Sequence, residues 1–117
     1  MLGKLTVGRM SREARRNPLV LRLPDKRRPV LILTRDDVID HLNEIIVVPV
    51  TRTIRGVPTE VVLTSEDGMP LVCTLNFDHV SLAQRDRIGD ILCTLPEARW
   101  PEVQRALLIG CGFEDQI

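Results

Sequence analysis

The feature that most constrains the fold is a series of short apolar runs, each closed by proline, glycine or a cluster of polar residues. Runs of this kind, rich in β-branched residues, are typical of strands. They lie at residues 18–23, 29–34, 44–50, 59–64, 71–77 and 87–95. Because the connections between them are short, neighbouring strands are expected to pair antiparallel. The order therefore predicts a mainly β fold, a small and strongly curved antiparallel barrel.

Two of these runs are apolar almost throughout, which indicates buried strands. In residues 29–34, Pro29 suits the opening position, because the first residue of a strand need not donate to the ladder. In residues 44–50, Pro49 predicts an edge strand or a bulge for the same reason. The stretch HVSLAQRD, residues 79–86, is interpreted as a connection between strands.

The segment RDDVIDHLNE, residues 35–44, interrupts the strand pattern with helical spacing. Thr34 or Asp36 is expected to cap a short inserted helix, because such side chains accept backbone N–H groups at a helix start. The residues expected to face inward are Val38, Ile39 and Leu42.

The end of the chain also has helical spacing. One face is formed by Trp100, Val103, Ala106, Leu107 and Gly110. Proline costs least near a helix start, where amides have no intrahelical partner, and glycine suits a helix end. Pro96 and Pro101 precede the pattern or open it, and Gly110 and Gly112 close it. The sequence therefore predicts a C-terminal helix.

Length and composition fit one domain: 117 residues, 44% of them hydrophobic and 27% charged. We expect a basic N-terminal arm or short helix over residues 1–16 and the barrel domain over 17–117. No apolar run approaches the roughly 20 residues that span a bilayer, and the first residues lack the apolar stretch of a secretory signal. These patterns predict a cytoplasmic protein.

The cysteines and histidines do not form a recognisable metal site. Cys73, Cys93 and Cys111 are too far apart for a CxxC motif, and all three have apolar neighbours. They are expected to be reduced and buried as small hydrophobic residues. His41 and His79 cannot bind zinc without distant partners. We therefore expect neither a metal nor another cofactor.

The net charge of zero conceals an uneven distribution. Residues 1–35 contain ten basic and two acidic side chains, a net charge of +8, and the remainder carries −8. This is either an accidental run on a neutral surface or a basic patch for a polyanion. Aromatic residues are only 3% of the chain, which argues against a nucleic-acid surface built on stacked aromatic side chains.

Several stretches of the chain, between about residues 18 and 113, resemble the MazF/PemK family, the toxins of toxin–antitoxin modules. The most specific are Arg28-Pro29 at the start of an apolar strand, and Val48-Pro49-Val50-Thr51 followed by Gly56-x-Pro58-x-Glu60-Val61. The resemblance implies an SH3-like barrel that forms homodimers. It also implies metal-independent cleavage of single-stranded RNA at short sequences, growth arrest, and neutralisation by an antitoxin with an acidic tail.

The same resemblance assigns roles to particular residues. Arg28 and Thr51 are the expected catalytic residues. The expected RNA-binding residues are Arg27, Arg52, Thr53, Arg55, Asn76, Asp78 and His79. RNA is cut without metal when the 2′-OH attacks the neighbouring phosphorus, which leaves a 2′,3′-cyclic phosphate and a 5′-OH. Arg28 supplies a cation for the phosphate and Thr51 a hydroxyl donor. The general base stays open between Asp78, His79 and an acidic residue of the segment before Arg28, where Asp25 stands.

Two other functions remain open at this stage. A CcdB-type toxin shares the barrel but acts by binding DNA gyrase, and it does not need the Arg28 and Thr51 pair. A non-catalytic SH3-like binding module is the other alternative. It is suggested by residues 17–22, which stand where the family has a strand ending in tryptophan and which contain no tryptophan.

Overall fold

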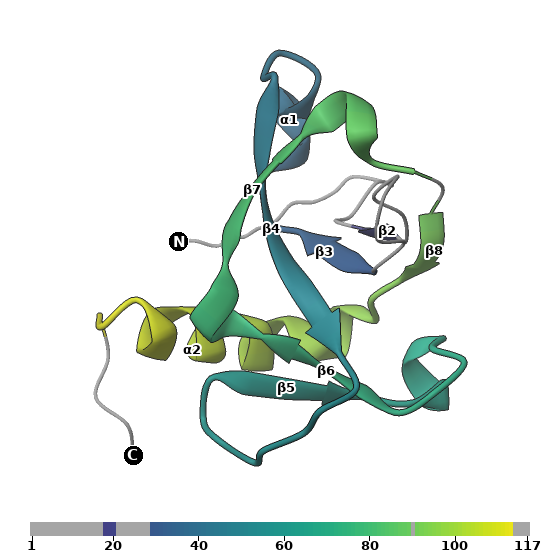
Figure 1. The fold of residues 1–117 in the computed structure, drawn as a ribbon, viewed down its shortest axis with the longest axis vertical. Helices are drawn as coiled ribbons and strands as arrows, with labels where there is room; N and C mark the ends of the chain where they lie inside the picture. The colour runs from purple at the N-terminus through teal and green to yellow at the C-terminus, as the bar shows by residue number, and fades with distance from the viewer. Residues whose placement is uncertain (1–17, 21–28, 90, 114–117) are drawn as a thin grey trace.

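The computed structural model describes residues 18–20, 29–89 and 91–113. In this part of the chain, seven strands form one antiparallel sheet, and two α-helices and four short 3-10 helices accompany it (Figure 1). The strands are β2 (Pro18–Val20), β3 (Val30–Ile32), β4 (Glu44–Thr51), β5 (Glu60–Leu63), β6 (Cys73–Asn76), β7 (Ser81–Gln84) and β8 (Ile91–Thr94). The helices are α1 (Asp36–Ile39), η1 (Ser65–Asp67), η2 (Phe77–His79), η3 (Arg85–Arg87), η4 (Glu97–Arg99) and α2 (Trp100–Gly110).

The long strand β4 organises the sheet. The strand order is β5-β6-β4-β3-β2-β8, and β7 also pairs with β4. Along one side, β4 pairs with β3, with Val30 opposite Pro49. Along its other side, β4 pairs first with β7, up to Val47, and then with β6, from Val50.

Pro49 therefore lies inside the sheet and not at an edge, which is one of the two positions expected from the sequence, and the register of β4 with β3 shows no bulge there. Val50 N donates to Pro29 O on the β3 side, at 3.1 Å. Because successive residues of a strand point their polar groups to opposite sides, the nitrogen of Pro49 faces the other side. There it falls between the residues that pair with β7 and those that pair with β6, where the ladder requires no N–H.

The two halves of β4 bury opposite faces. In the first half, Ile45 and Val47 are buried in a small apolar cluster with Val30, Ile32 and Ile39. In the second half the buried residues are Val48 and Val50, which belong to the larger core. That core also contains Leu31, Val61, Leu63, Met69, Cys73, Leu75, Phe77, Leu95, Val103 and Ala106. The face of β4 that carries Pro49 and Thr51 is thus opposite the larger core.

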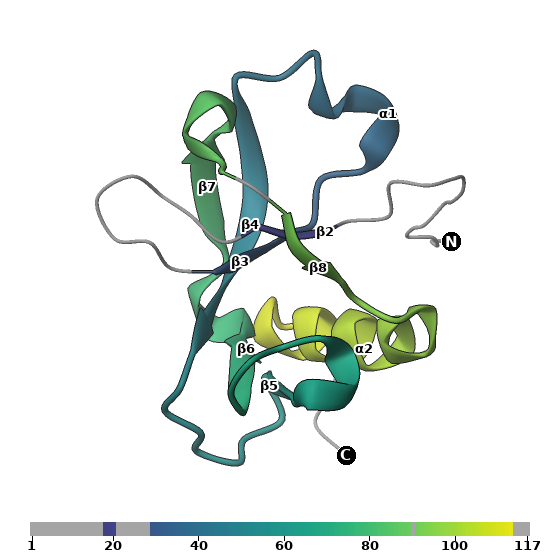
Figure 2. The same ribbon diagram turned by 90° about the vertical axis from the view of Figure 1, so that its right-hand side faces the viewer.

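The two α-helices are well separated: α1 lies at one end of the molecule and α2 crosses its other half, as Figures 1 and 2 show. α1 contributes Ile39 to the smaller cluster. α2 runs along β5 and buries Val103, Ala106 and Ile109. Gly110 permits α2 to lie close to η2. A Cβ atom at this position would lie only 2.7 Å from Phe77 O, which is too close for any other residue. The helix therefore supports the turn that follows β6.

The mainly β fold with an inserted helix and a C-terminal helix is confirmed, and four details are corrected. Residues 81–84, interpreted as part of a connection, form β7; three of these four residues are exposed, so no apolar run marks them. Helix α1 has Arg35 at its N-cap, while Thr34 Oγ1 accepts from Ile46 N at 2.7 Å, and Leu42 is 40% exposed. Cys111 is exposed because it follows the end of α2, whereas Cys73 is buried.

The expected arm at residues 1–16 and the first apolar run beyond Val20 lie outside the described residues. Within those residues, none of the helices combines the length and the apolar character that crossing a membrane requires.

Candidate functional site

An open hollow of about 260 Å³ lies on the polar face of the sheet. Its lining consists of Pro49, Thr51, Thr53, Arg55, Asn76 and His79. Five of these six residues are among the expected catalytic or RNA-binding residues, although they come from separate parts of the sequence. The fold thus brings most of the described candidates to one place.

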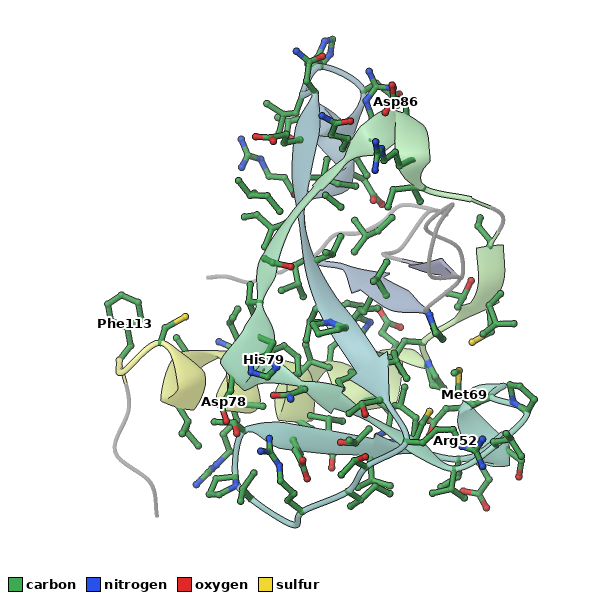
Figure 3. All side chains as sticks on the ribbon, in the orientation of Figure 1. Arg52, Met69, Asp78, His79, Asp86 and Phe113 are labelled. Atoms are coloured by element: carbon green, nitrogen blue, oxygen red, sulfur yellow. The ribbon has the colours of Figure 1, made fainter. Side chains whose placement is uncertain are left out.

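The other candidates have different positions. Arg52 is exposed, and Figure 3 shows it away from Asp78 and His79. Asp78 lies beside His79 in the turn after β6 but does not line the hollow. Arg27 and Arg28 lie outside the described residues.

Thr51 reaches the hollow because it closes β4 on the face opposite the larger core. Its neighbour across the sheet is Thr74 of β6. The Oγ1 atom of Thr51 accepts a hydrogen bond from Thr53 N at 3.2 Å, which starts the turn that leaves the strand. This contact uses a lone pair of the hydroxyl and not its proton. Thr51 can therefore donate to a ligand while it holds the loop.

The carboxylate of Glu60 holds the loop over residues 51–58 by accepting hydrogen bonds from its backbone. One carboxylate oxygen accepts from Arg55 N at 3.0 Å and from Gly56 N at 2.9 Å, and the other lies 3.4 Å from Arg55 Nε. Gly56 has a φ of 73°, which permits both amides to point at the same carboxylate. The side chain of Glu60 is only 2% exposed, whereas that of Arg55 is 52% exposed.

These contacts also set the pKa of Glu60. Burial acts to raise the pKa of the carboxyl group, but the hydrogen bonds from Arg55 and Gly56 outweigh it and lower the pKa below its ordinary value. Glu60 is therefore charged at neutral pH. It keeps the backbone of the loop in place and leaves much of the Arg55 guanidinium to solvent.

The opposite wall of the hollow is formed by the end of β6 and by η2. Asn76 is the N-cap of η2, and its Oδ1 accepts from Asp78 N at 3.0 Å. Its Nδ2 lies 3.3 Å from Nδ1 of His79. Thr59 Oγ1 donates to Asp78 Oδ2 at 2.8 Å. The buried residues Thr59 and Asn76 thus hold two exposed ones, Asp78 and His79.

The lining of the hollow suits an acceptor-rich ligand. Hydroxyl, amide, guanidinium and imidazole groups are present, and neither Glu60 nor Asp78 lines it. Donors of these types bind phosphate oxygens, and an arginine adds a favourable charge. In the part of the chain that the structure describes, no three His, Cys, Asp or Glu residues are grouped as a metal site requires.

Two supporting residues were not predicted for these roles. Glu60 belongs to the motif that marks the resemblance, but its spacing from Gly56 does not reveal that its carboxylate holds the loop. Thr59 looks like an ordinary strand residue in the sequence. The signal for Glu60 is its place as the acid that follows a Gly-x-Pro turn, where unpaired loop amides need an acceptor.

Comparison with known proteins identifies the family. A model of the PemK-like, MazF-like toxins of type II toxin–antitoxin systems matches residues 15–110. The chain belongs to this family. This MazF-like chain is 46% identical over 97 residues to the endoribonuclease MazF3 of Mycobacterium tuberculosis, covering 83% of this chain and 92% of the relative.

Solved structures of MazF-type proteins resemble the fold of this chain. The Mycobacterium tuberculosis toxin MazF-mt6 superimposes with a TM-score of 0.78 at 30% identity, covering 84% of this chain and 99% of the toxin. A mycobacterial endoribonuclease in complex with its cognate antitoxin gives a TM-score of 0.74 at 27% identity, covering 88% of this chain and all of that one. The MazF-like fold thus extends over most of both chains.

Proposed function

We propose that this MazF-like endoribonuclease cuts single-stranded RNA at a short specific sequence without a metal, by attack of the 2′-OH on the adjacent phosphorus. The observation that carries the proposal is the hydrogen bond from Val50 N to Pro29 O, at 3.1 Å. Pro29 follows Arg28 directly in the sequence, and Val50 precedes Thr51. The pairing of β3 with β4 therefore supports a joint action of Arg28 and Thr51.

In the proposed reaction, the 2′ oxygen forms a bond to phosphorus and the bond from phosphorus to the 5′ oxygen breaks. The 2′ proton passes to a base, and the leaving 5′ oxygen receives a proton. Arg28 stabilises the negative charge on the phosphate oxygens, since its guanidinium stays protonated. Thr51 donates its hydroxyl proton to the same phosphate. The products carry a 2′,3′-cyclic phosphate and a 5′-OH.

The same surface is proposed to bind an antitoxin. A mycobacterial relative is known in complex with its cognate antitoxin. Arg55 lines the hollow, Arg52 directly follows Thr51 in the sequence, and both are exposed, so an acidic antitoxin segment would compete with RNA for them. We further propose that the chain acts as a homodimer in the cytoplasm and that its cleavage of RNA arrests growth.

The direct test of the catalytic pair compares two arginines that stand before and after β3 in the sequence, Arg28 and Arg35. Arg28→Ala is expected to abolish RNA cleavage, since loss of one donor to a developing charge costs roughly 10²–10³ in rate and a lost charge costs more. Thr51→Ala is expected to slow cleavage less. Arg35→Ala is the matched control, because Arg35 is exposed and forms an ion pair with Asp37.

The assay uses purified protein, a defined single-stranded RNA and EDTA. Growth arrest on expression and circular dichroism are recorded for the same variants. An Arg28→Ala protein that is folded and cuts at the wild-type rate would refute the assignment. Absence of RNA cleavage by the wild-type protein would refute the proposed function itself.

A further inference from the structure

The contacts of Asn76 determine which nitrogen of His79 carries a proton. A backbone N–H can only donate, so the Asn76 atom that faces Asp78 N, at 3.0 Å, must be the amide oxygen. The amide nitrogen is thereby turned toward His79 Nδ1, at 3.3 Å. Because an amide nitrogen donates and does not accept, Nδ1 must be the acceptor of this hydrogen bond.

A neutral imidazole has one N–H group, and with Nδ1 as acceptor this group is at Nε2. His79 lines the same hollow as Thr51 and Thr53. We infer that His79 presents a fixed Nε2–H donor to a phosphate oxygen of the RNA in this hollow, and that it is not the general base. The inference rests on the proposed function, in which RNA occupies the hollow.

Phosphate is the favoured acceptor because of what surrounds the ring. The hollow is lined by hydroxyl, amide and guanidinium donors, whereas neither Glu60 nor Asp78 lines it. The Asp78 carboxylate, next in sequence to His79, is bound to Thr59 Oγ1 at 2.8 Å. Every polar side chain that lines the hollow can therefore donate a hydrogen bond to an acceptor-rich group such as phosphate.

The same arrangement excludes His79 as a proton acceptor in its neutral form. Nδ1 is occupied by the Asn76 amide, and Nε2 already carries its proton. A general base needs a lone pair within reach of the 2′-OH. His79 is thus a donor that contacts the substrate, and the 2′ proton must pass to another group.

Nitrogen NMR of the free protein tests the tautomer without any activity measurement. With the ring neutral, long-range 15N correlations are expected to show a pyridine-like Nδ1 and a pyrrole-like Nε2 for His79. His79→Gln assigns the signals, and His41, the only other histidine and an exposed one, serves as the internal reference. A pyrrole-like Nδ1 in His79 would overturn the inference.

Asn76→Asp sharpens this measurement. The substitution keeps an oxygen for Asp78 N but replaces the donor that faces His79 by an acceptor. The neutral ring is then expected to move its proton to Nδ1. An unchanged tautomer in a variant with the wild-type circular dichroism spectrum would show that Asn76 does not set it, and would overturn the argument.

Substitutions of His79 separate a donor from a base. The glutamine amide nitrogen occupies a place similar to Nε2, so His79→Gln retains a donor but has no group able to take a proton at neutral pH. We expect His79→Leu to lower kcat/KM about tenfold to a hundredfold, and His79→Gln to stay within about threefold of wild type. His79→Asn, whose amide nitrogen falls short, is expected to behave like His79→Leu.

The outcomes distinguish this inference from the proposed function. If wild type cuts RNA but His79→Gln is as slow as His79→Leu, the donor role fails while the proposed function stands. If the loss in His79→Leu differs between RNA sequences, the contact is to a base, and the phosphate assignment fails. If wild type does not cut RNA, the proposed function fails, whatever the tautomer.

Discussion

Strand β5 has a buried carboxylate near each of its ends, and the two serve different purposes. Glu60 opens the strand and is 2% exposed in its side chain, and Asp67, in η1 after the strand, is 3% exposed. Glu60 accepts mainly from the backbone of the loop over residues 51–58. Asp67 accepts from Thr64 N at 2.9 Å and from Arg99 Nη1 at 2.6 Å.

The partners decide what each carboxylate does. Arg99 precedes α2 and is 23% exposed, and its Nη2 also donates to Val62 O at 2.7 Å. Asp67 therefore ties the C-terminal helix to the sheet and is expected to govern the stability of the whole domain. Glu60 holds a loop with an exposed arginine and is expected to govern the site. A buried charge thus contributes to folding or to function according to the element that it fixes.

The largest effect on stability is expected at Asp67. Asp67→Ala leaves the Arg99 guanidinium without its buried partner and removes the acceptor of Thr64 N, which is one half of the capping box of η1. Breaking a buried pair typically costs roughly 3–5 kcal/mol, and since Arg99 is partly exposed we expect about 3 kcal/mol. Chemical denaturation measures this loss. Cleavage by the folded fraction is expected to stay within about twofold of wild type, because neither Asp67 nor Arg99 lines the hollow.

Glu102→Gln is the control for this first prediction, because Glu102 is also an acidic partner of Arg99. The side chain of Glu102 is 58% exposed. Exposed pairs contribute about 0–1 kcal/mol, so little loss is expected. Equal destabilisation by the two substitutions would show that burial of Asp67 is not what matters.

Glu60→Gln is expected to have the opposite profile. The charged acceptor of the loop amides is lost, which we expect to lower the free energy of unfolding by about 1 kcal/mol. Cleavage is expected to fall about tenfold, because a poorly held loop misplaces Thr53 and Arg55. Hydrogen exchange at the amides of Arg55 and Gly56 measures the cause. Glu66→Gln, an exposed acid of η1, is the control. If Glu60→Gln cuts RNA at the normal rate although the amides of Arg55 and Gly56 exchange faster, the position of the loop does not affect catalysis.

The pH dependence of stability is the smallest expected effect. The pKa of Glu60 is lower in the folded protein than its ordinary value of 4.5. Folded Glu60 therefore binds fewer protons than unfolded Glu60, and its stabilisation is complete above about pH 4.5 and is lost as the pH falls through the lower folded pKa. Denaturation of wild type and Glu60→Gln between pH 7 and 3 measures this. A difference that stays constant over that range would contradict the role given to the charge.

The sequence predicts the architecture well because its strands and helices carry local signals. The run over residues 29–34 and the terminal helix are marked by continuous apolar residues and by helical spacing. Strand β7 has no such mark, because it is mostly exposed and pairs through its backbone with β4. Pairing of this kind depends on the partner strand and leaves no pattern in the residues of the strand itself.

For the site, the residues that line the hollow can be predicted from the sequence, but the contacts that hold them in place cannot. Thr51, Asn76 and His79 are named through the resemblance, and the structure brings them to one hollow. The role of Glu60 depends on two amides that point at one carboxylate, and the tautomer of His79 depends on the orientation of the Asn76 amide. Both are three-dimensional contacts between residues several positions apart, which spacing alone does not predict.

The measurement that tests the central claim most directly uses an RNA in which only the ribose 5′ to the cut is deoxyribose. If the 2′-OH is the nucleophile, this substrate must remain uncut, while an RNA with deoxyribose at a neighbouring position is cut normally. We expect binding to be nearly unchanged, EDTA to have no effect, and the product of the unmodified RNA to end in a 2′,3′-cyclic phosphate. Cutting of the substituted RNA at the normal rate would contradict the account, because the attacking oxygen would then come from water.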